Sequence, residues 1–205
     1  MGEEHDLAYI AMDYIQGESL DHHVQSEALL PLADVFGIGV QVAEALDYAH
    51  GQKVVHRDVK PGNIIYDRGT GRLKVTDFGI ACLTDNSKTR TGTVLGSPFY
   101  MSPEQIAGQR VDGRADLYSL GVTLYQLLCG RLPFEGDSLT SLMYKIANDK
   151  PQAIRKLRRE LPACVTRFIN KALEKDPLRR YASGEAMADA IKRCAEQAGT
   201  GHRRG

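Results

Sequence analysis

Apolar residues recur at helical spacing in several long segments of the chain. In residues 33–50 they fall three and four positions apart, which is typical of an amphipathic helix. Pro31 and Gly51 stand where such a helix would begin and end. The same pattern predicts two further amphipathic helices, at residues 137–148 and 164–174, and a last helix is predicted at residues 183–195.

Residues 112–128 are instead apolar on nearly all sides, and Gly130 and Pro133 follow them. A helix of this kind is buried among other elements, and this one is too short and too polar to cross a bilayer. No other apolar run approaches the ~18 residues that a membrane span requires, and no signal peptide opens the chain. We therefore expect a cytoplasmic chain without membrane contact, although a longer parent protein could be membrane-anchored.

Short apolar runs predict the strands. Residues 64–66 and 73–75 form two of them, and the turn-forming residues 67–71 between them predict a hairpin. Residues 7–15 are rich in apolar and aromatic side chains and predict another strand. Taken with a length of 205 residues, these elements predict one α+β domain that is mainly helical and carries short β-hairpins.

Three segments lack such periodicity. Residues 80–96 are polar and rich in Thr and Gly, and a loop of that length is usually functional or disordered. Residues 196–205 are typical of a flexible tail. The basic run at residues 155–159 lacks interleaved aromatic residues, which favours a solvated surface patch over a nucleic-acid site.

Charge and cysteine content narrow the class of protein. Lys plus Arg and Asp plus Glu balance at 26 each, so no global field attracts nucleic acid or an anionic membrane. The cysteines show no metal-ligand spacing, which favours reduced thiols that pack as small hydrophobic side chains; they are Cys82, Cys129, Cys164 and Cys194. We expect the neighbouring His22 and His23 to lie on a solvated helix face.

Residues 54–79 carry the chemistry. They read VVHRDVKPGNIIYDRGTGRLKVTDFG, with Asp58, Lys60 and Asn63 before the predicted hairpin and Asp77 after it. The hairpin would fold the chain back so that Asp77 returns beside Asn63, where two oxygen ligands could share one cation. A carboxylate, a cation and two metal ligands in this order suit chemistry on a phosphate.

These motifs identify a family resemblance. The pattern His56-Arg57-Asp58 with Asn63, followed by Asp77-Phe78-Gly79, resembles the C-terminal lobe of eukaryotic-like Ser/Thr protein kinases of the bacterial type, over about residues 7–191. The resemblance implies the C-terminal lobe of the protein-kinase-like fold. Residues 1–17 would be a remnant of the last N-lobe strands and the hinge, residues 18–195 the C-lobe, and residues 196–205 the tail.

The resemblance also implies roles at the site. Asp58 would be the catalytic base, Lys60 would face the transferred phosphate, and Asn63 and Asp77 would hold Mg²⁺, with Mn²⁺ as an alternative ion. The backbone and side chains around ATP would come from Met12, Asp13, Ile15 and Glu18. Ile65 would lie beneath the adenine ring, although an ordinary core position is an equally good interpretation of this residue.

Other residues would regulate or brace the site. Arg57 would pair with a phosphate on Thr91 or Thr93, and Ser97 would lie in the substrate-docking loop beside Asp58 and Lys60. Three charged residues are better interpreted as structural: Asp116 would brace the backbone at residues 56–58, and Glu104 and Arg180 would form a partly buried ion pair.

The chain contains neither a Gly-rich loop nor the strand lysine and helix glutamate that members of this family carry upstream. We therefore expect a Ser/Thr protein kinase lobe that acts on protein Ser and Thr hydroxyls but has little activity alone. The alternatives are a non-catalytic interaction or scaffold module and a small-molecule phosphotransferase. We also expect a homodimer through residues 7–15, which would cover the apolar floor of the cleft.

Overall fold

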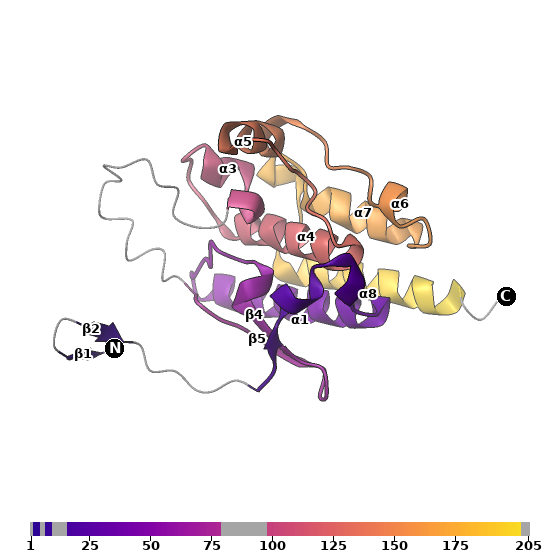
Figure 1. Cartoon of the computed structure of the whole chain (residues 1–205), viewed down its shortest axis with the longest axis horizontal. Helices are drawn as coiled ribbons and strands as arrows, with labels where there is room; N and C mark the ends of the chain where they lie inside the picture. Colours follow the sequence, from indigo (N-terminus) through magenta and orange to yellow (C-terminus); the bar gives the residue numbers. More distant parts are fainter. Residues whose placement is uncertain (1, 5–6, 10–15, 79–97, 202–205) are drawn as a thin grey trace.

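The structure is a computed structural model that describes residues 2–4, 7–9, 16–78 and 98–201 (Figure 1). Its helices are α1 (Leu32–Gly51), α3 (Pro103–Ile106), α4 (Gly113–Cys129), α5 (Leu139–Asn148), α6 (Ile154–Leu157), α7 (Ala163–Ala172) and α8 (Gly184–Gly201). Its strands are β1 (Gly2–Glu4), β2 (Leu7–Tyr9), β3 (Glu18–Ser19), β4 (Ile64–Asp67) and β5 (Arg72–Val75). The described part of the chain is therefore mainly helical with small antiparallel sheets, as the sequence predicts.

Helices α1 and α4 form the centre of the core. α1 buries residues three and four positions apart, among them Val35, Ile38, Val42 and Leu46, and packs mainly against α8 and α4. α4 is buried along nearly its whole length, which confirms the expectation from its all-round apolar pattern. In Figure 1, α4 lies between the layer of α1 and α8 and the layer of α5, α6 and α7.

Local chemistry sets both ends of α4. The side chain of Asp112 caps the first turn by accepting a hydrogen bond from the Arg114 backbone N–H, and Gly130 ends the helix with a left-handed φ of 70°. Between them, Gly121 allows α7 to approach closely, since a Cβ at this position would lie 2.7 Å from the Cβ of Ala172. A larger residue at position 121 would push α7 away from the core.

A three-stranded sheet in the order β3-β4-β5 lies beside α1. The predicted hairpin is present, with Ile64 opposite Val75 and Asp67 opposite Arg72. β3 extends it by pairing Glu18 with Tyr66 and Ser19 with Ile65. Of the strand predicted over residues 7–15, only β2 is described, paired with β1; residues 10–15 lie outside the described residues.

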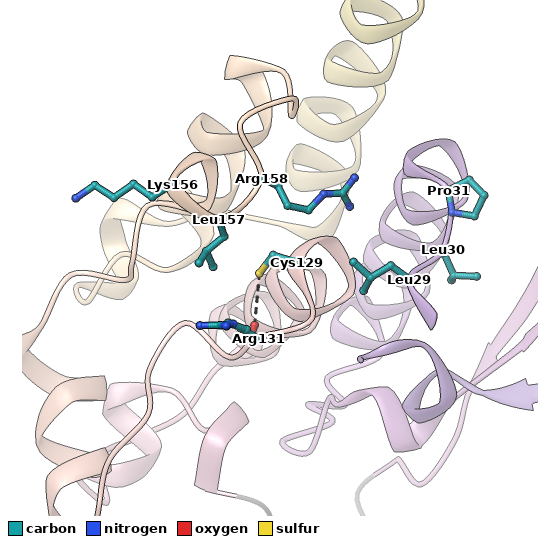
Figure 2. Close-up of a pocket in the computed structure, with 8 residues that line it drawn as sticks. All are labelled: Leu29, Leu30, Pro31, Cys129, Arg131, Lys156, Leu157 and Arg158. Carbon is teal, nitrogen blue, oxygen red and sulfur yellow. Dashed lines mark hydrogen bonds between the residues drawn. The ribbon is translucent and has the colours of Figure 1, made fainter. Parts of the chain in front are cut away.

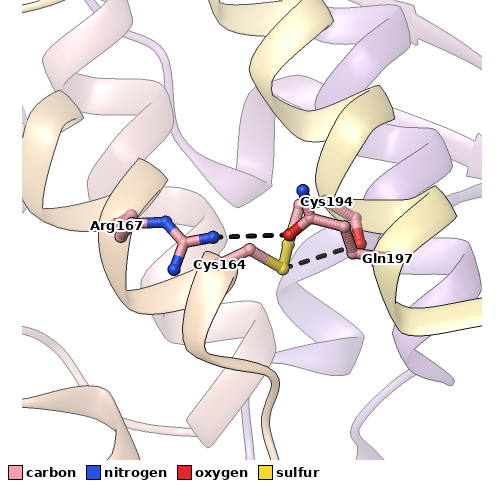
Figure 3. Close-up of a disulfide and its surroundings, with 4 residues drawn as sticks. All are labelled: Cys164, Arg167, Cys194 and Gln197. Carbon is pink, nitrogen blue, oxygen red and sulfur yellow. Dashed lines mark hydrogen bonds between the residues drawn. A yellow bond between two sulfur atoms is a disulfide. The ribbon is translucent and has the colours of Figure 1, made fainter. Parts of the chain in front are cut away.

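Two expectations are corrected at the C-terminal end. α8 continues to Gly201, so the segment from residue 196, predicted as a flexible tail, begins as helix. Cys164 of α7 and Cys194 of α8 form a disulfide, so the prediction of reduced thiols is wrong for this pair (Figure 3). Their Cα atoms lie 5.5 Å apart, within the range that a disulfide needs. Cys129 is a buried free thiol, and Cys82 lies outside the described residues.

The disulfide should contribute measurably to stability. It closes a loop of 30 residues, and the lost entropy of the unfolded chain corresponds to about 2–4 kcal/mol. We expect the Cys164→Ala/Cys194→Ala variant to lose that much free energy of unfolding in urea titrations. Dithiothreitol should lower the stability of the parent chain to the same extent and leave the variant unchanged. If the parent chain does not respond to the reductant, this pair is not oxidised in solution.

None of the helices in the described ranges has the length and the apolar composition that a membrane span requires.

Candidate active site

Asp116, in the first turn of α4, anchors the loop of residues 52–63 between α1 and β4. The fully buried Asp116 carboxylate accepts hydrogen bonds from the backbone N–H of His56 at 2.9 Å and of Arg57 at 2.7 Å. His50 of α1 approaches the same carboxylate with Nε2 at 2.8 Å. Asp116 therefore ties the loop, α1 and α4 together at one point.

The backbone of Arg57 is held in an unusual conformation. Its φ is 68°, in the left-handed region that side chains other than glycine rarely adopt. Two long-range contacts hold it there: Asp116 accepts from the Arg57 N–H, and Gln105 Nε2 donates to the Arg57 carbonyl at 2.9 Å. These contacts fix the backbone immediately before Asp58.

Asp58, Lys60 and Asn63 contact one another directly. Lys60 Nζ lies 2.6 Å from Asp58 Oδ2, and Asn63 Nδ2 donates to the same oxygen at 3.0 Å and to the Asp58 carbonyl at 2.8 Å. Asp58 and Lys60 both remain partly exposed, whereas Asn63 is buried. Both donors reach Oδ2, so among the described residues Asp58 Oδ1 is the oxygen left to accept a proton.

The hairpin returns the chain to Asn63. The backbone N–H of Thr76 donates to the Asn63 carbonyl at 2.8 Å, and the Thr76 hydroxyl donates to the same oxygen at 3.2 Å. His56 Nε2 lies 2.8 Å from the Thr76 carbonyl, and its ring contacts that of Phe78 with a centroid distance of 4.5 Å. Asp77 is thereby held between two fixed residues, exposed and with a φ of 62°.

The donor set of Asn63 and Asp77 fits a hard divalent cation. The two oxygen atoms near Asn63 Nδ2 can only accept, which fixes the amide orientation and leaves Oδ1 of Asn63 as the oxygen available to a ligand. Asp77 supplies a carboxylate. Among the described residues there is no cluster of three or more His, Cys, Asp or Glu suited to a metal ion. Two oxygen ligands suit an ion that is completed by nucleotide phosphates and water, as is usual for Mg²⁺.

Two of the residues predicted to contact the nucleotide, Glu18 and Ile65, lie in the three-stranded sheet. In β4 the side chains of Ile64 and Tyr66 are buried in the core, and Ile65 lies on the opposite, partly exposed face. Glu18 in β3 contacts His23, whose Nε2 lies 2.9 Å from Glu18 Oε1. His23 is buried and its Nδ1 lies 3.1 Å from the Ala28 carbonyl, so the expectation of a solvated face is wrong for His23, although His22 is exposed.

A buried ion pair holds the segment that follows residue 97. Arg180 donates to both carboxylate oxygens of Glu104, at 2.6 and 2.8 Å, and both side chains are almost completely buried rather than partly buried as expected. Ser102 caps α3 reciprocally with Gln105, the residue that also contacts Arg57. Through Gln105, the cap of α3 is connected to the loop that carries Asp58.

Tyr100 fastens the same segment to α4. Its hydroxyl donates to Gln126 Oε1 at 2.6 Å, and its carbonyl accepts from the Ser119 hydroxyl at 2.7 Å. Burial raises the pKa of Tyr100 to about 12, so the phenol stays a neutral donor throughout the physiological range.

Six of the predicted site residues lie outside the described residues: Met12, Asp13, Ile15, Thr91, Thr93 and Ser97. Conversely, the contacts of His50, Thr76 and Gln105 with the site were not predicted from the sequence. Thr76 and Gln105 contact the loop directly, and His50 contacts the Asp116 carboxylate that anchors it. Nothing in the spacing along the chain pointed to these contacts.

Replacing Asp116 should lower the free energy of unfolding, because its carboxylate accepts two hydrogen bonds from the loop backbone. The Asp116→Ala variant would leave the buried N–H of His56 and the partly buried N–H of Arg57 without this acceptor, and a buried N–H group without an acceptor costs about 1–3 kcal/mol. We expect a correspondingly lower free energy of unfolding in urea titrations. Asp112→Ala is the control, because it removes only a helix cap worth about 1 kcal/mol. Equal losses in the two variants would contradict the anchoring role of Asp116.

Comparisons with known proteins agree with this geometry. Residues 1–191 match the family model described as "Protein kinase domain". The chain is 39% identical over 193 residues to the serine/threonine-protein kinase PrkC of Bacillus subtilis, covering 94% of this chain and 30% of PrkC. It is 41% identical over 194 residues to the serine/threonine-protein kinase PksC of Streptomyces coelicolor, covering 91% of this chain and 35% of PksC. The chain thus spans about a third of the length of these relatives.

The fold is also similar to that of a solved structure, Rad53 1–466 in complex with AMP-PNP. The TM-score is 0.73 at 27% sequence identity, over 88% of this chain and 46% of that protein.

Proposed function

Because this chain belongs to the protein kinase family, we propose that it is the catalytic lobe of an enzyme that transfers the ATP γ-phosphate to Ser and Thr hydroxyls of proteins. The observation that carries the proposal is the contact of Asp58 with both Lys60 and Asn63 on a loop anchored by Asp116. A base, a cation and a metal ligand are thus joined on one rigid loop.

Asp58 acts on the substrate hydroxyl. Its Oδ2 is held by Lys60 and Asn63, so the carboxylate has a fixed orientation and Oδ1 can accept the hydroxyl proton. The hydroxyl oxygen then bonds to the γ-phosphorus as the bond from that phosphorus to the bridging oxygen breaks, and ADP leaves with the electron pair. Such a positioned base contributes typically about 10²–10⁴-fold. Lys60 lies close enough to Asp58 to place its positive charge beside the transferred phosphate. Lysine at this position after the aspartate resembles the Ser/Thr-specific pattern.

Asn63 and Asp77 are the residues that would hold the divalent cation. When bound, the ion neutralises charge on the nucleotide phosphates. Asn63 presents Oδ1 because its amide nitrogen is engaged by Asp58, and Asp77 is directed by its left-handed backbone between Thr76 and Phe78. Mn²⁺ has the same preference for oxygen ligands and is the alternative ion. Ile65, on the exposed face of β4, is the apolar position proposed to lie beneath the adenine ring.

The isolated chain should be much less active than an extended one, because its sequence contains no Gly-rich loop and no strand lysine to hold the nucleotide phosphates. The test compares transfer of radiolabelled phosphate from ATP to myelin basic protein by this chain and by a chain extended at its N-terminus with its upstream genomic sequence. The proposal predicts transfer by the extended chain. If neither transfers phosphate but the chain captures a partner, the non-catalytic scaffold function is favoured instead.

Phosphorylation of the Thr-rich loop should raise activity. Thr91 and Thr93 are the proposed sites, and Arg57, which lies next to Asp58, would pair with the phosphate through charge-assisted hydrogen bonds. We expect the Thr91→Ala/Thr93→Ala variant of the extended chain to resist activation by preincubation with ATP and Mg²⁺. The Thr70→Ala variant, altered in the hairpin turn, is the control. Equal activation of both variants would exclude the two threonines as regulatory sites.

We also propose a homodimer formed through residues 7–15, as a hypothesis motivated by the apolar character of that segment. Light scattering that gives the mass of one chain at high concentration would contradict it. A cytoplasmic location stays a prediction, which fractionation of the producing cells would check.

A further inference from the structure

A hollow of about 750 Å³ lies at the end of α4 that is opposite to the catalytic loop (Figure 2). Asp116, in the first turn of α4, contacts the loop, whereas Cys129, the last residue of the helix, lines the hollow. At 1.5 Å per residue these two positions lie about 20 Å apart along the helix. The hollow is therefore separate from the site that holds Asp58.

Three segments that are distant in sequence form its walls. Figure 2 shows residues 29–31, which precede α1, on one side, residues 156–158 at the end of α6 on the other, and the end of α4 between them. Three residues of this lining, Lys156, Leu157 and Arg158, belong to the basic run at residues 155–159. The sequence pattern alone predicted that this run is a solvated surface patch. In the structure, part of that run forms one wall of a concave site.

Apolar side chains form part of the lining. Leu29 and Leu157 are partly exposed, and the buried Cys129 thiol lies between the two walls. The thiol bonds to the carbonyl of Tyr125 at 3.1 Å, and burial raises its pKa, so it stays uncharged. A large apolar side chain of a ligand would therefore find uncharged partners here.

The rim is basic. Arg131, Lys156 and Arg158 line the hollow, and no carboxylate is among its lining residues within the described part of the chain. Arg158 is fixed, because it donates to the Leu128 carbonyl at 2.8 Å and to Glu160 at 2.6 Å. Arg131 and Lys156 are exposed and form no ion pair with any residue that the structure describes. Since the chain as a whole has no net charge, this clustering of cations is local.

We propose that this hollow, formed by residues 29–31, Cys129, Arg131 and residues 156–158, binds an acidic peptide segment of a partner protein that carries a large apolar side chain. The apolar side chain enters between Leu29 and Leu157, and flanking carboxylates meet Arg131 and Lys156 at the rim. Charge complementarity at the rim selects the acidic segment, and Leu29 and Leu157 favour an apolar side chain over a polar one. This binding is independent of phosphate transfer.

Fluorescence anisotropy with labelled peptides tests the proposal on the full chain. The probe is the peptide EEFLEE, and the comparison peptides are EEGSEE, which lacks the apolar pair, and KKFLKK, which reverses the charge. We expect EEFLEE to bind at least about 10-fold more tightly than either, because the apolar pair and the carboxylates each contribute at least that factor. Its affinity should fall as salt rises, since the rim contacts are exposed.

Two charge-reversal variants locate the site. Arg131→Glu/Lys156→Glu should weaken binding of EEFLEE by at least about 10-fold. Arg68→Glu/Arg110→Glu makes the same change in net charge at exposed positions elsewhere and should change the affinity less than about 2-fold. Thermal melts of both variants establish that they are folded. Leu157→Ala should weaken binding of EEFLEE without altering that of EEGSEE.

Several outcomes would overturn the proposal. They are equal affinity for EEFLEE and EEGSEE, equal weakening by the two charge-reversal variants, and no binding of EEFLEE at all. Anionic phosphatidylserine vesicles form a further arm. If they bind the chain in a manner that depends on Arg131 and Lys156 while EEFLEE does not, the site binds a lipid surface and the proposal is wrong.

Discussion

Replacing Asp58 with Asn should lower kcat for phosphate transfer by about 10²–10⁴-fold in the N-terminally extended chain. Asparagine has nearly the same shape, so its side-chain oxygen can still accept from Lys60 and Asn63, but it cannot take up the proton of the substrate hydroxyl. We therefore expect the loss in kcat, with a much smaller change in KM for ATP. Steady-state kinetics with radiolabelled ATP and a generic protein substrate measure both.

The matched control for this variant is Asp189→Asn, which makes the same chemical change on the exposed face of α8. Its kcat should equal that of the parent protein. If Asp58→Asn retains a rate within about threefold of the parent, Asp58 is not a base for this reaction, because that change corresponds to less than 1 kcal/mol of barrier. Another group would then have to accept the proton of the substrate hydroxyl.

Replacing Arg180 with Met should lower the free energy of unfolding by about 3–5 kcal/mol, because it leaves the buried Glu104 carboxylate without its partner. Arg180 also donates to the carbonyls of Glu174 at 2.7 Å and Lys175 at 3.0 Å, and its guanidinium stacks over the Tyr118 ring at 4.8 Å. Few side chains in the described part of the chain connect so many segments. Urea titration measures the loss.

An exposed ion pair provides the control for Arg180. Lys192 and Glu44 lie 2.7 Å apart and each is about half exposed, at 49% and 50%. Solvent screens such a pair, so Lys192→Met should lower the free energy of unfolding far less than Arg180→Met does. If Arg180→Met and Lys192→Met lose similar amounts of stability, the ion pair between Arg180 and Glu104 is not a structural anchor.

The helices and the hairpin could be predicted from the sequence because their spacing is a local property. α1, α5 and α7 begin and end within two residues of their predicted bounds, and the predicted hairpin has the expected strands. The order of Asp58, Lys60 and Asn63 along one short loop likewise indicated a phosphate site. Residues this close in sequence cannot lie far apart in space, and here they contact one another.

Contacts between distant segments could not be predicted in the same way. His23 was expected in solvent, yet it is buried against Glu18 and the Ala28 carbonyl. Cys164 and Cys194 were expected as separate thiols, yet α7 and α8 pack so that the two form a disulfide. In both cases the local sequence pattern carries no information about the segment that packs against the side chain. The packing of that second segment sets the environment of the side chain.

The sequence by itself predicted the long helices, the hairpin, the order of the proposed site residues and the family to which the chain belongs, because these depend on the types and spacing of neighbouring residues. The tertiary structure alone decided how those residues are held. It set three donors around the Asp116 carboxylate, a left-handed turn at Arg57, and a basic hollow about 20 Å away at the far end of α4. Each of these features arises where helices distant in sequence meet, and the meeting depends on the packing of the whole core.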